Sequence, residues 1–348
     1  MVDLWFAIAA LMLAAYVVLD GFDFGAGALH LFVAKTDDER RQVLAAIGPY
    51  WDGNEVWLLA SGGVLFLAFP RVLASGLSGF YFAIFLVLWT LIFRGLAIEF
   101  RSHIDQRLWR GGWDAVFAAA STVLPVLFGA AMGNLVRGLP VNQDGWFSLP
   151  LFTDFSARAP VGILDWFTVF AGVFALAALA AHGATFLAWK TSGPVHDRSR
   201  RAAATLYSVV GVTWPVLTVA TLLVNQAMLE ALPRRPIALA AMALAIGGLT
   251  AVALGVPRGR DLQAFLGSCA FLAGMLAATA ACLFPVMLKS VTDDRWSLTV
   301  HNSSVAPESL QVALWWGGIG LPLALLYLYT LFRLHRGKAV AAPHGEGY

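Results

Sequence analysis

The sequence predicts an all-α polytopic membrane protein with about nine transmembrane helices. Two observations support this fold class. First, 59% of the 348 residues are hydrophobic and 13% are charged, with a mean hydropathy of +0.73, whereas soluble domains carry about 25% charged residues. Second, apolar runs that approach the length of about 20 residues needed to cross a bilayer recur along the whole chain. The net charge of +2 is small and the basic residues lie in short loops, so we exclude nucleic-acid binding.

The nine predicted spans form a single domain over residues 1–336, and residues 337–348 are predicted to be a disordered tail. The spans cover residues 4–33, 56–70, 76–98, 115–135, 161–189, 202–224, 237–256, 262–288 and 310–332. The first lacks a positively charged segment before it and is interpreted as a retained helix, not a signal peptide. The second is short, so its helix must include residues 51–55 if it is to cross the membrane.

The orientation follows from the basic residues of the connecting loops, which concentrate on the cytoplasmic side. Fifteen Lys and Arg residues lie on the side that contains Lys35, Arg101 and Lys190, and seven lie on the other side. We therefore predict that the N-terminus is outside and the C-terminus is cytoplasmic.

The first span carries two acids near its cytoplasmic end, Asp20 and Asp23. Residues three apart share one face of a helix, and two carboxylates on one face at low dielectric cannot both ionise at low cost. One of them could therefore bind and release a proton, which is what a proton relay requires. The alternative is that Asp23 is solvated at the interface or caps a helix broken at Gly21 and Gly25.

The second span begins with Asp52, Asn54 and Glu55, and the apolar run after them indicates that these groups enter the bilayer with the helix. Asp52 and Glu55 are three residues apart and so share a face. A competing interpretation is a helix cap, in which Asp52 accepts a backbone N–H and Glu55 completes a capping box. The spacing alone does not separate the cap from the relay.

The third span contains an isolated arginine, Arg94. A guanidinium inside a membrane requires a carboxylate or a cofactor anion beside it, and a salt bridge that holds helices together is the structural alternative. Glu99 and Arg101 end this span and are predicted to be interfacial. The candidate partners of Arg94 are Asp20, Asp23, Asp52 and Glu99.

The remaining polar groups have simpler interpretations. His182, beside Gly183 in the fifth span, could carry a proton or ligate a haem, but a hydrogen-bonded packing role is commoner, and no second His or Met at matching depth stands out. His30 and His103 lie near loops and are predicted to be solvated. Asn134 is predicted to be an amide that bonds a helix end.

No soluble-enzyme motif is present. The chain has no Walker motif, dinucleotide-binding fingerprint, nucleophile elbow or zinc spacing. Cys269 and Cys282 lie thirteen residues apart in one span and on different helix faces, so they form neither a disulfide framework nor a metal site. Two longer outer loops, 137–160 and 289–308, carry Trp146, Phe147 and Trp296; an interfacial aromatic belt is the favoured interpretation, and packing on a partner or capping of the bundle are the alternatives.

The motifs together resemble subunit II of the cytochrome bd quinol oxidases, including the cyanide-insensitive branch. They run in the family's order over nearly the whole chain, and the Trp51-Asp52-Gly53-Asn54 stretch is the specific one. The matching stretches are Asp20-Gly21-Phe22-Asp23-Phe24-Gly25, Gly48-Pro49-Tyr50-Trp51-Asp52-Gly53-Asn54-Glu55-Val56-Trp57-Leu58, Gly79-Phe80-Tyr81, Arg94, Glu99-Phe100-Arg101, Gly133-Asn134, His182-Gly183-Ala184, Phe284-Pro285 and Ser297-Leu298-Thr299.

The resemblance implies two four-helix bundles plus one helix, paired with a subunit I that holds two b-type haems, haem d and the quinol site. This chain is expected to bind no haem directly and to supply part of a proton route from the cytoplasm. Some members of the family also hold a structural quinone in this subunit, and the sequence does not decide whether this chain does. Small single-helix accessory subunits and a bacterial inner membrane are further expectations. The implied proton residues are Asp20, Asp23, Asp52 and Glu55, supported by Arg94, Asn54, Glu99 and His182.

Two departures from the family pattern stand out. Glu55 is an acid where some members have glutamine, and His301 follows the Ser297-Leu298-Thr299 stretch without an assigned role.

The predicted function is a subunit of a complex that oxidises quinol and reduces oxygen to water. Residues alone leave two alternatives: a proton- or cation-coupled secondary transporter, although no inverted repeat is visible, and a purely structural partner whose acids cap helices and pair with Arg94.

Overall fold

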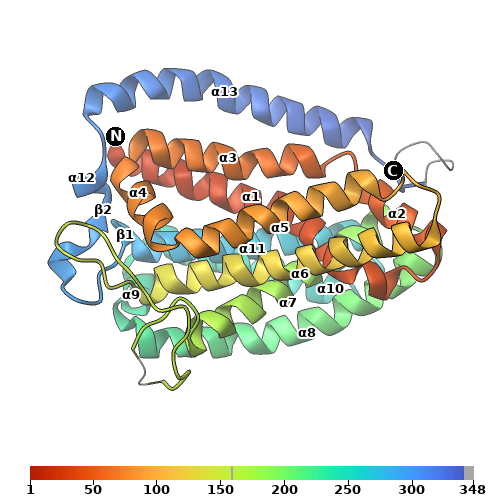
Figure 1. Ribbon diagram of the computed structural model, residues 1–348, viewed down its shortest axis with the longest axis horizontal. Helices are drawn as coiled ribbons and strands as arrows, with labels where there is room; N and C mark the ends of the chain where they lie inside the picture. The colour runs from red at the N-terminus through yellow and green to blue at the C-terminus, as the bar shows by residue number, and fades with distance from the viewer. Residues whose placement is uncertain (158–159, 341–348) are drawn as a thin grey trace.

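The computed structural model describes residues 1–157 and 160–340 as a bundle of long, nearly parallel and antiparallel helices (Figure 1). A two-stranded antiparallel sheet, β1 (Val286–Leu288) and β2 (Leu298–Thr299), lies at one end with the short turns η1 (Leu232–Arg234) and η2 (Asp294–Trp296). The helices are α1 (Val2–Val33), α2 (Asp37–Ile47), α3 (Trp51–Ala68), α4 (Pro70–Gly79), α5 (Tyr81–Phe100), α6 (Arg107–Arg137), α7 (Trp166–Lys190), α8 (Gly193–Val224), α9 (Gln226–Ala231), α10 (Pro236–Gly255), α11 (Asp261–Leu283), α12 (Val300–Ser303) and α13 (Pro307–Leu334).

Within the described residues, eight helices are long and apolar enough to cross a membrane, or nine if α3 and α4 count as one span bent by 120°. This confirms the predicted fold class and number of spans. As expected, α3 begins at Trp51, five residues before its apolar run. The third span differs from the prediction, because residues 76–79 belong to α4. Pro70 has no N–H to donate and suits the first position of a helix, so a new helix starts there.

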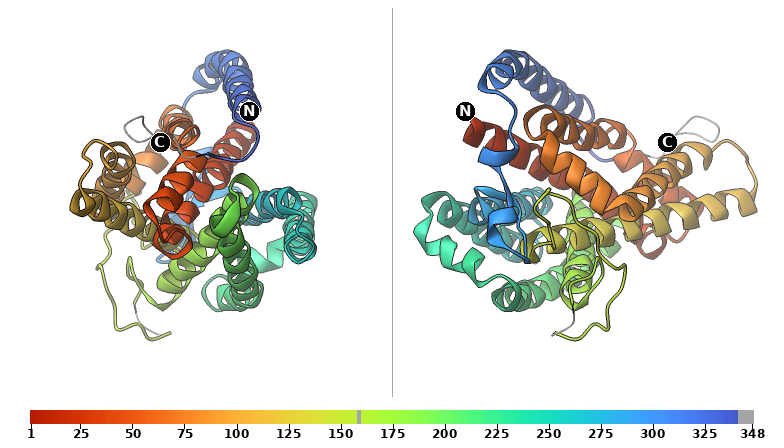
Figure 2. Two further views of the ribbon diagram at one scale, coloured as in Figure 1. Left: turned by 90° about the vertical axis from the view of Figure 1, so that its right-hand side faces the viewer. Right: turned by 60° about the vertical axis from the view of Figure 1, so that its left-hand side comes forward.

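The helices form two groups of four with a ninth beside them. The first group is α1, α3, α5 and α6, and the second is α7, α8, α10 and α11, as the view along the helices shows (Figure 2, left). The ninth helix, α13, lies along one edge beside α1 and α3 (Figure 1). Only Leu310 and Ala313 of α13 are buried, so most of its apolar surface faces outward.

Glycines let α1 and α7, which join the two groups, approach closely. A Cβ on Gly25 would lie 2.7 Å from the Cα of Gly183, and a Cβ on Gly183 would lie 2.3 Å from the carbonyl carbon of Gly25. These contacts are shorter than any side chain tolerates. The two backbones therefore touch at the level of Asp23, which fixes the depth of the acids on α1 relative to the second group.

The two ends of the bundle are closed differently. We call the end that carries Lys35, Arg101 and Lys190 the basic end; α2 and residues 335–340 fold over it (Figure 1). There the Ala339 N–H donates to the Lys190 carbonyl, and the rest of the predicted tail, residues 341–348, lies outside the described residues. At the opposite end Leu139 forms an isolated β-bridge with Ser290, which follows β1, and Phe147 is buried against Gly79 while Trp146 is 47% exposed. The outer loops thus cap the bundle.

Candidate functional site

A buried ion pair joins α1, α3 and α5 near the basic end. Arg94 donates from Nη1 to Asp20 Oδ1 at 2.6 Å and from Nη2 to Glu55 Oε1 at 2.8 Å. Arg94 and Asp20 are fully buried, whereas the Glu55 side chain is 26% exposed. The guanidinium also lies 4.5 Å from the centre of the Phe24 ring, a favourable position for a cation. Arg94 thus pairs with one predicted partner, Asp20, and with Glu55, which had not been predicted as a partner.

Asp23 lies in the same region but has a different partner. The Asn54 amide donates to Asp23 Oδ2 at 2.8 Å and also to the Leu19 carbonyl at 3.1 Å. Asp23 and Asn54 are both buried, so the interfacial and solvated alternative for Asp23 is wrong. We call Asp20, Asp23, Asn54, Glu55 and Arg94 the inner cluster.

The inner cluster contains more negative groups and more acceptor atoms than its donors satisfy. It has three carboxylates and one guanidinium, so full ionisation would leave two uncompensated negative charges in a low-dielectric region. Four of its buried atoms have no hydrogen-bond partner among the described residues, and neither does the hydroxyl of neighbouring Tyr16. Those four atoms are Asp20 Oδ2, Asp23 Oδ1, Asn54 Oδ1 and Arg94 Nε. Buried polar groups normally have partners, so the cluster is suited to bind protons or water.

Two of the predicted site residues lie outside this cluster. Asp52 is exposed at the start of α3, and Glu99 is exposed at the end of α5. The competing interpretation, a capping box at Asp52, is wrong, because α3 has Tyr50 at its N-cap position with no side-chain cap, and the Glu55 carboxylate turns to Arg94 instead. The α3 face that enters the cluster is formed by Asn54 and Glu55.

His182 is a packing residue. Its Nε2 bonds the Val18 carbonyl at 2.8 Å and its Nδ1 bonds Ser268 Oγ at 2.5 Å. The ring stacks on Phe265 with 5.4 Å between the ring centres. Since both ring nitrogens are engaged, His182 has no free nitrogen with which to ligate a haem. Within residues 1–157 and 160–340, no three His, Cys, Asp or Glu side chains are grouped so that they could hold a metal ion.

A second charged network, which the sequence did not predict, lies closer to the basic end. Asp114 accepts from Arg101 Nε at 2.6 Å and from Arg40 Nη1 at 2.9 Å, and its Oδ1 lies 2.7 Å from His30 Nε2. Arg101 Nη2 also donates to Asp37 at 2.8 Å. We call this network the outer cluster; its members are His30, Asp37, Arg40, Arg101, Asp105, Arg110 and Asp114.

Two predictions are wrong at the outer cluster. His30 is fully buried instead of solvated, and Arg101 is 2% exposed instead of interfacial. Burial alone would lower the pKa of Arg101, but the hydrogen bonds to Asp114 and Asp37 raise it above its ordinary value, so the guanidinium stays charged. One signal in the sequence could have found His30: it follows Asp23 by seven residues, two helical turns, and so shares its face of α1.

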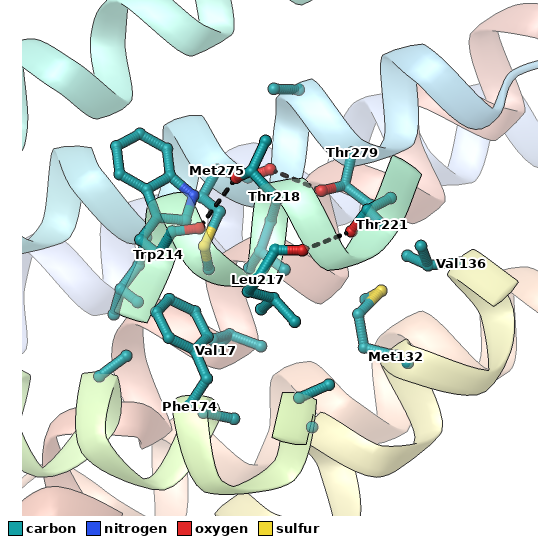
Figure 3. Close-up of a pocket in the computed structure, with 18 of the residues that line it drawn as sticks. Val17, Met132, Val136, Phe174, Trp214, Leu217, Thr218, Thr221, Met275 and Thr279 are labelled. Carbon is teal, nitrogen blue, oxygen red and sulfur yellow. Dashed lines mark hydrogen bonds between the residues drawn. The ribbon is translucent and has the colours of Figure 1, made fainter. Parts of the chain in front are cut away.

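An apolar cavity of about 190 Å³ lies between the two helix groups and is bordered by the Tyr16 side chain. Phe174, Trp214 and Met275 are among the side chains that line it (Figure 3). The threonine hydroxyls at its wall point back to their own helices, where they donate to backbone carbonyls at 2.9 Å. The cavity therefore suits an apolar molecule, with the unpaired Tyr16 hydroxyl as a donor at its edge.

Comparison with known proteins gives one consistent result. The family model described as cytochrome bd terminal oxidase subunit II matches residues 1–335. The chain is 32% identical to the cytochrome bd-I ubiquinol oxidase subunit 2 of Escherichia coli (strain K12), over 93% of this chain and 91% of that one. It is also 32% identical to the cytochrome bd ubiquinol oxidase subunit 2 of Bacillus subtilis (strain 168), over 89% and 88% of the two chains.

The fold has a counterpart among solved structures. A chain of the bd oxidase from Geobacillus thermodenitrificans superposes with a TM-score of 0.72, covering 96% of this chain and 98% of that chain at 16% sequence identity. At this identity the likeness concerns the arrangement of the helices.

Proposed function

The chain belongs to the cytochrome bd terminal oxidase subunit II family, and from this premise we propose that its own part in the complex is to carry protons from the cytoplasmic side toward the oxygen-reducing centre. The chain is a membrane-embedded subunit of a terminal quinol oxidase, and the complex as a whole is an oxidoreductase. Membership of this family also excludes the alternative function, a proton- or cation-coupled secondary transporter. The single observation that carries the proton proposal is the inner cluster, with its three carboxylates around one guanidinium.

The proposed path begins at exposed Asp52 and continues to Glu55, whose side chain is partly exposed and touches Arg94. Arg94 holds the Asp20 and Glu55 carboxylates in place through short hydrogen bonds. Asp23 accepts from the Asn54 amide and has no ion pair within the described residues, so it is the carboxyl on which an extra proton reduces the negative charge at least cost. We assign the proton-carrying step to Asp23 and the positioning of the acids to Arg94 and Asn54.

The proposed partner is a subunit I that carries two b-type haems, haem d and the quinol site, with quinol and oxygen as substrates of the complex. The outward-facing apolar surface of α13 supports docking against that subunit, a small single-helix accessory subunit or lipid. The proposed location is the bacterial inner membrane, with the basic end in the cytoplasm.

A structural quinone fits the apolar cavity. The aromatic and aliphatic wall would hold the isoprenoid tail, and the Tyr16 hydroxyl would donate to a carbonyl of the head group. Such a quinone would stabilise the contact between the two helix groups; the redox chemistry of the complex belongs to subunit I.

The test is to express the complete complex with Asp23→Asn or Asp52→Asn and to measure oxygen consumption with quinol as the donor. Either variant should lower turnover, and Asp23→Asn by roughly tenfold or more because the buried proton carrier is lost. The reduced minus oxidised spectrum should keep the haem b and haem d bands, which shows that the complex is assembled. Asp144→Asn, an exposed aspartate at the opposite end, is the matched control. Normal turnover and proton uptake in Asp23→Asn would overturn the proposal.

A further inference from the structure

One face of α1 connects the inner and outer clusters. Asp23 belongs to the inner cluster, and His30, seven residues later, belongs to the outer cluster. Seven residues make two helical turns, a rise of about 10 Å. Gly27 lies between them on the same face, four residues after Asp23 and three before His30.

His30 has one engaged and one free ring nitrogen. Nε2 faces Asp114, whose carboxylate also accepts from Arg101 and Arg40. Because two guanidiniums hold Asp114 ionised, it can only accept, so Nε2 must carry the hydrogen of this bond. Nδ1 then has a free lone pair, and it is buried without a partner among the described residues. A carboxylate that fixes one nitrogen and leaves the other as a base is the arrangement that prepares histidine for proton transfer.

A polar side chain from α6 fills the space between the two clusters. A Cβ placed on Gly27 would lie 2.1 Å from Ser121 Oγ, so the serine occupies the surface of α1 at that point. The Ser121 hydroxyl is fully buried and has no partner in the described part of the chain, and the same holds for Asp23 Oδ1. Three buried polar atoms that have no partner among the described residues therefore lie along this face of α1: His30 Nδ1, Ser121 Oγ and Asp23 Oδ1.

The charges on either side favour a proton that moves inward. The outer cluster has three carboxylates and three guanidiniums, so it is balanced when His30 is neutral. The groups that face His30 are Asp114 of α6, Arg40 of α2 and Arg101 after α5. The inner cluster has an excess of carboxylates, which attracts a positive charge formed on the imidazole.

We propose that His30 is a second proton carrier, which supplies Asp23 through Ser121 from the basic end and so gives the inner cluster an inlet besides Asp52. Nδ1 accepts a proton from water and the ring becomes an imidazolium, while Nε2–H stays bonded to Asp114. Nδ1 then releases the proton to the Ser121 hydroxyl, which passes one on to the Asp23 carboxylate. One proton moves, the imidazole returns to its neutral form, and no electron is transferred. This inference rests on the proposed function of the inner cluster.

The experiment compares His30→Gln and His30→Asn in the complete complex with the unmodified complex. Both amides can donate to Asp114 but cannot carry a proton at neutral pH. With haem bands intact, turnover should fall roughly tenfold at about pH 8, where protons are scarce, and less than about twofold at about pH 6. Proton uptake, followed with a pH-sensitive dye, should slow in parallel. His103→Gln, an exposed histidine beyond α5, is the matched control and should change neither.

Asp23→Asn distinguishes this inference from the proposed function. If Asp23→Asn slows proton uptake while the His30 variants keep the unmodified pH profile, the second inlet is wrong and the inner-cluster path stands. If neither residue affects uptake, both proposals fail. Loss of haem in both His30 variants would assign the histidine to holding the helices together and would also overturn the inference.

Discussion

The inner and outer clusters contain the same kinds of residue but differ in how their charges are paired. In the outer cluster each carboxylate faces at least one guanidinium, and Asp114 and Asp37 each accept from two arginines. In the inner cluster the one guanidinium pairs with two of the three acids, and Asp20 Oδ2 and Asp23 Oδ1 have no partner within the described residues. The paired carboxylates of the outer cluster hold helices together, whereas the unpaired carboxylate oxygens of the inner cluster are available to bind protons.

This difference also explains where the two clusters lie. The outer cluster joins α2, the turn after α5 and the start of α6 to the end of α1, all near the basic end, where partial hydration lowers the cost of burying ions. The inner cluster lies deeper, beside the close contact of α1 and α7 at Gly25 and Gly183. Keeping spare carboxylates at that depth is expensive, which is the reason to assign them a function.

The largest effect is expected from Arg94→Gln. The substitution leaves Asp20 and Glu55 without their cation, and losing one member of a buried ion pair costs roughly 3 to 5 kcal/mol. The purified complex should unfold at a lower temperature and lose haem during purification. Arg295→Gln, which replaces an 85% exposed arginine at the opposite end, is the control and should leave the unfolding temperature unchanged. Normal thermal stability of Arg94→Gln would show that the inner cluster needs no internal cation.

A smaller loss of stability is expected from Asp114→Asn. The asparagine oxygen can still accept one hydrogen bond, and Arg101 keeps its bond to Asp37, so we expect a cost of about 2 to 3 kcal/mol. Turnover per haem in the assembled fraction should stay within about twofold of the unmodified complex at about pH 6, where the His30 route is not limiting. Thermal unfolding and oxygen consumption of the same preparation provide the two measurements. A loss of turnover per haem in the assembled fraction beyond this expectation would mean that the outer cluster is not merely a set of balanced ion pairs.

The sequence predicts the spans well because hydrophobic length is a local property. Nine apolar runs correspond to eight or nine spanning helices, and the isolated Arg94 correctly indicates a buried acid cluster. The face that each residue presents is harder to predict. Spacing places Asp52 and Glu55 on one side of α3, but Glu55 turns to Arg94 while Asp52 remains exposed, and Asn54 reaches Asp23. That outcome depends on the rotation of α3 against α1, which a single sequence does not contain.

His30 shows the second limit. Its position near the end of α1 predicts solvation, yet α2 and the residues after α5 fold back over it and bury it completely. The contact with Asp114 spans 84 residues of sequence. No sequence feature near His30 predicts this contact with Asp114, whereas the helix face that His30 shares with Asp23 follows from their spacing alone. The contacts between distant segments that cover the basic end are therefore the part of the site that sequence patterns do not predict.

The smallest effect, and the sharpest test of the comparison, is expected from Glu55→Gln. The amide oxygen can still accept from Arg94, Asp20 remains paired, and the side chain is partly exposed, so stability should change by less than about 1 kcal/mol. The variant removes one of the inner cluster's two excess negative charges, so proton uptake measured with a pH-sensitive dye should slow modestly, far less than in Asp23→Asn. If Glu55→Gln matched Asp23→Asn, Glu55 itself would be the principal proton carrier, and Asp23 would hold Asn54 in place.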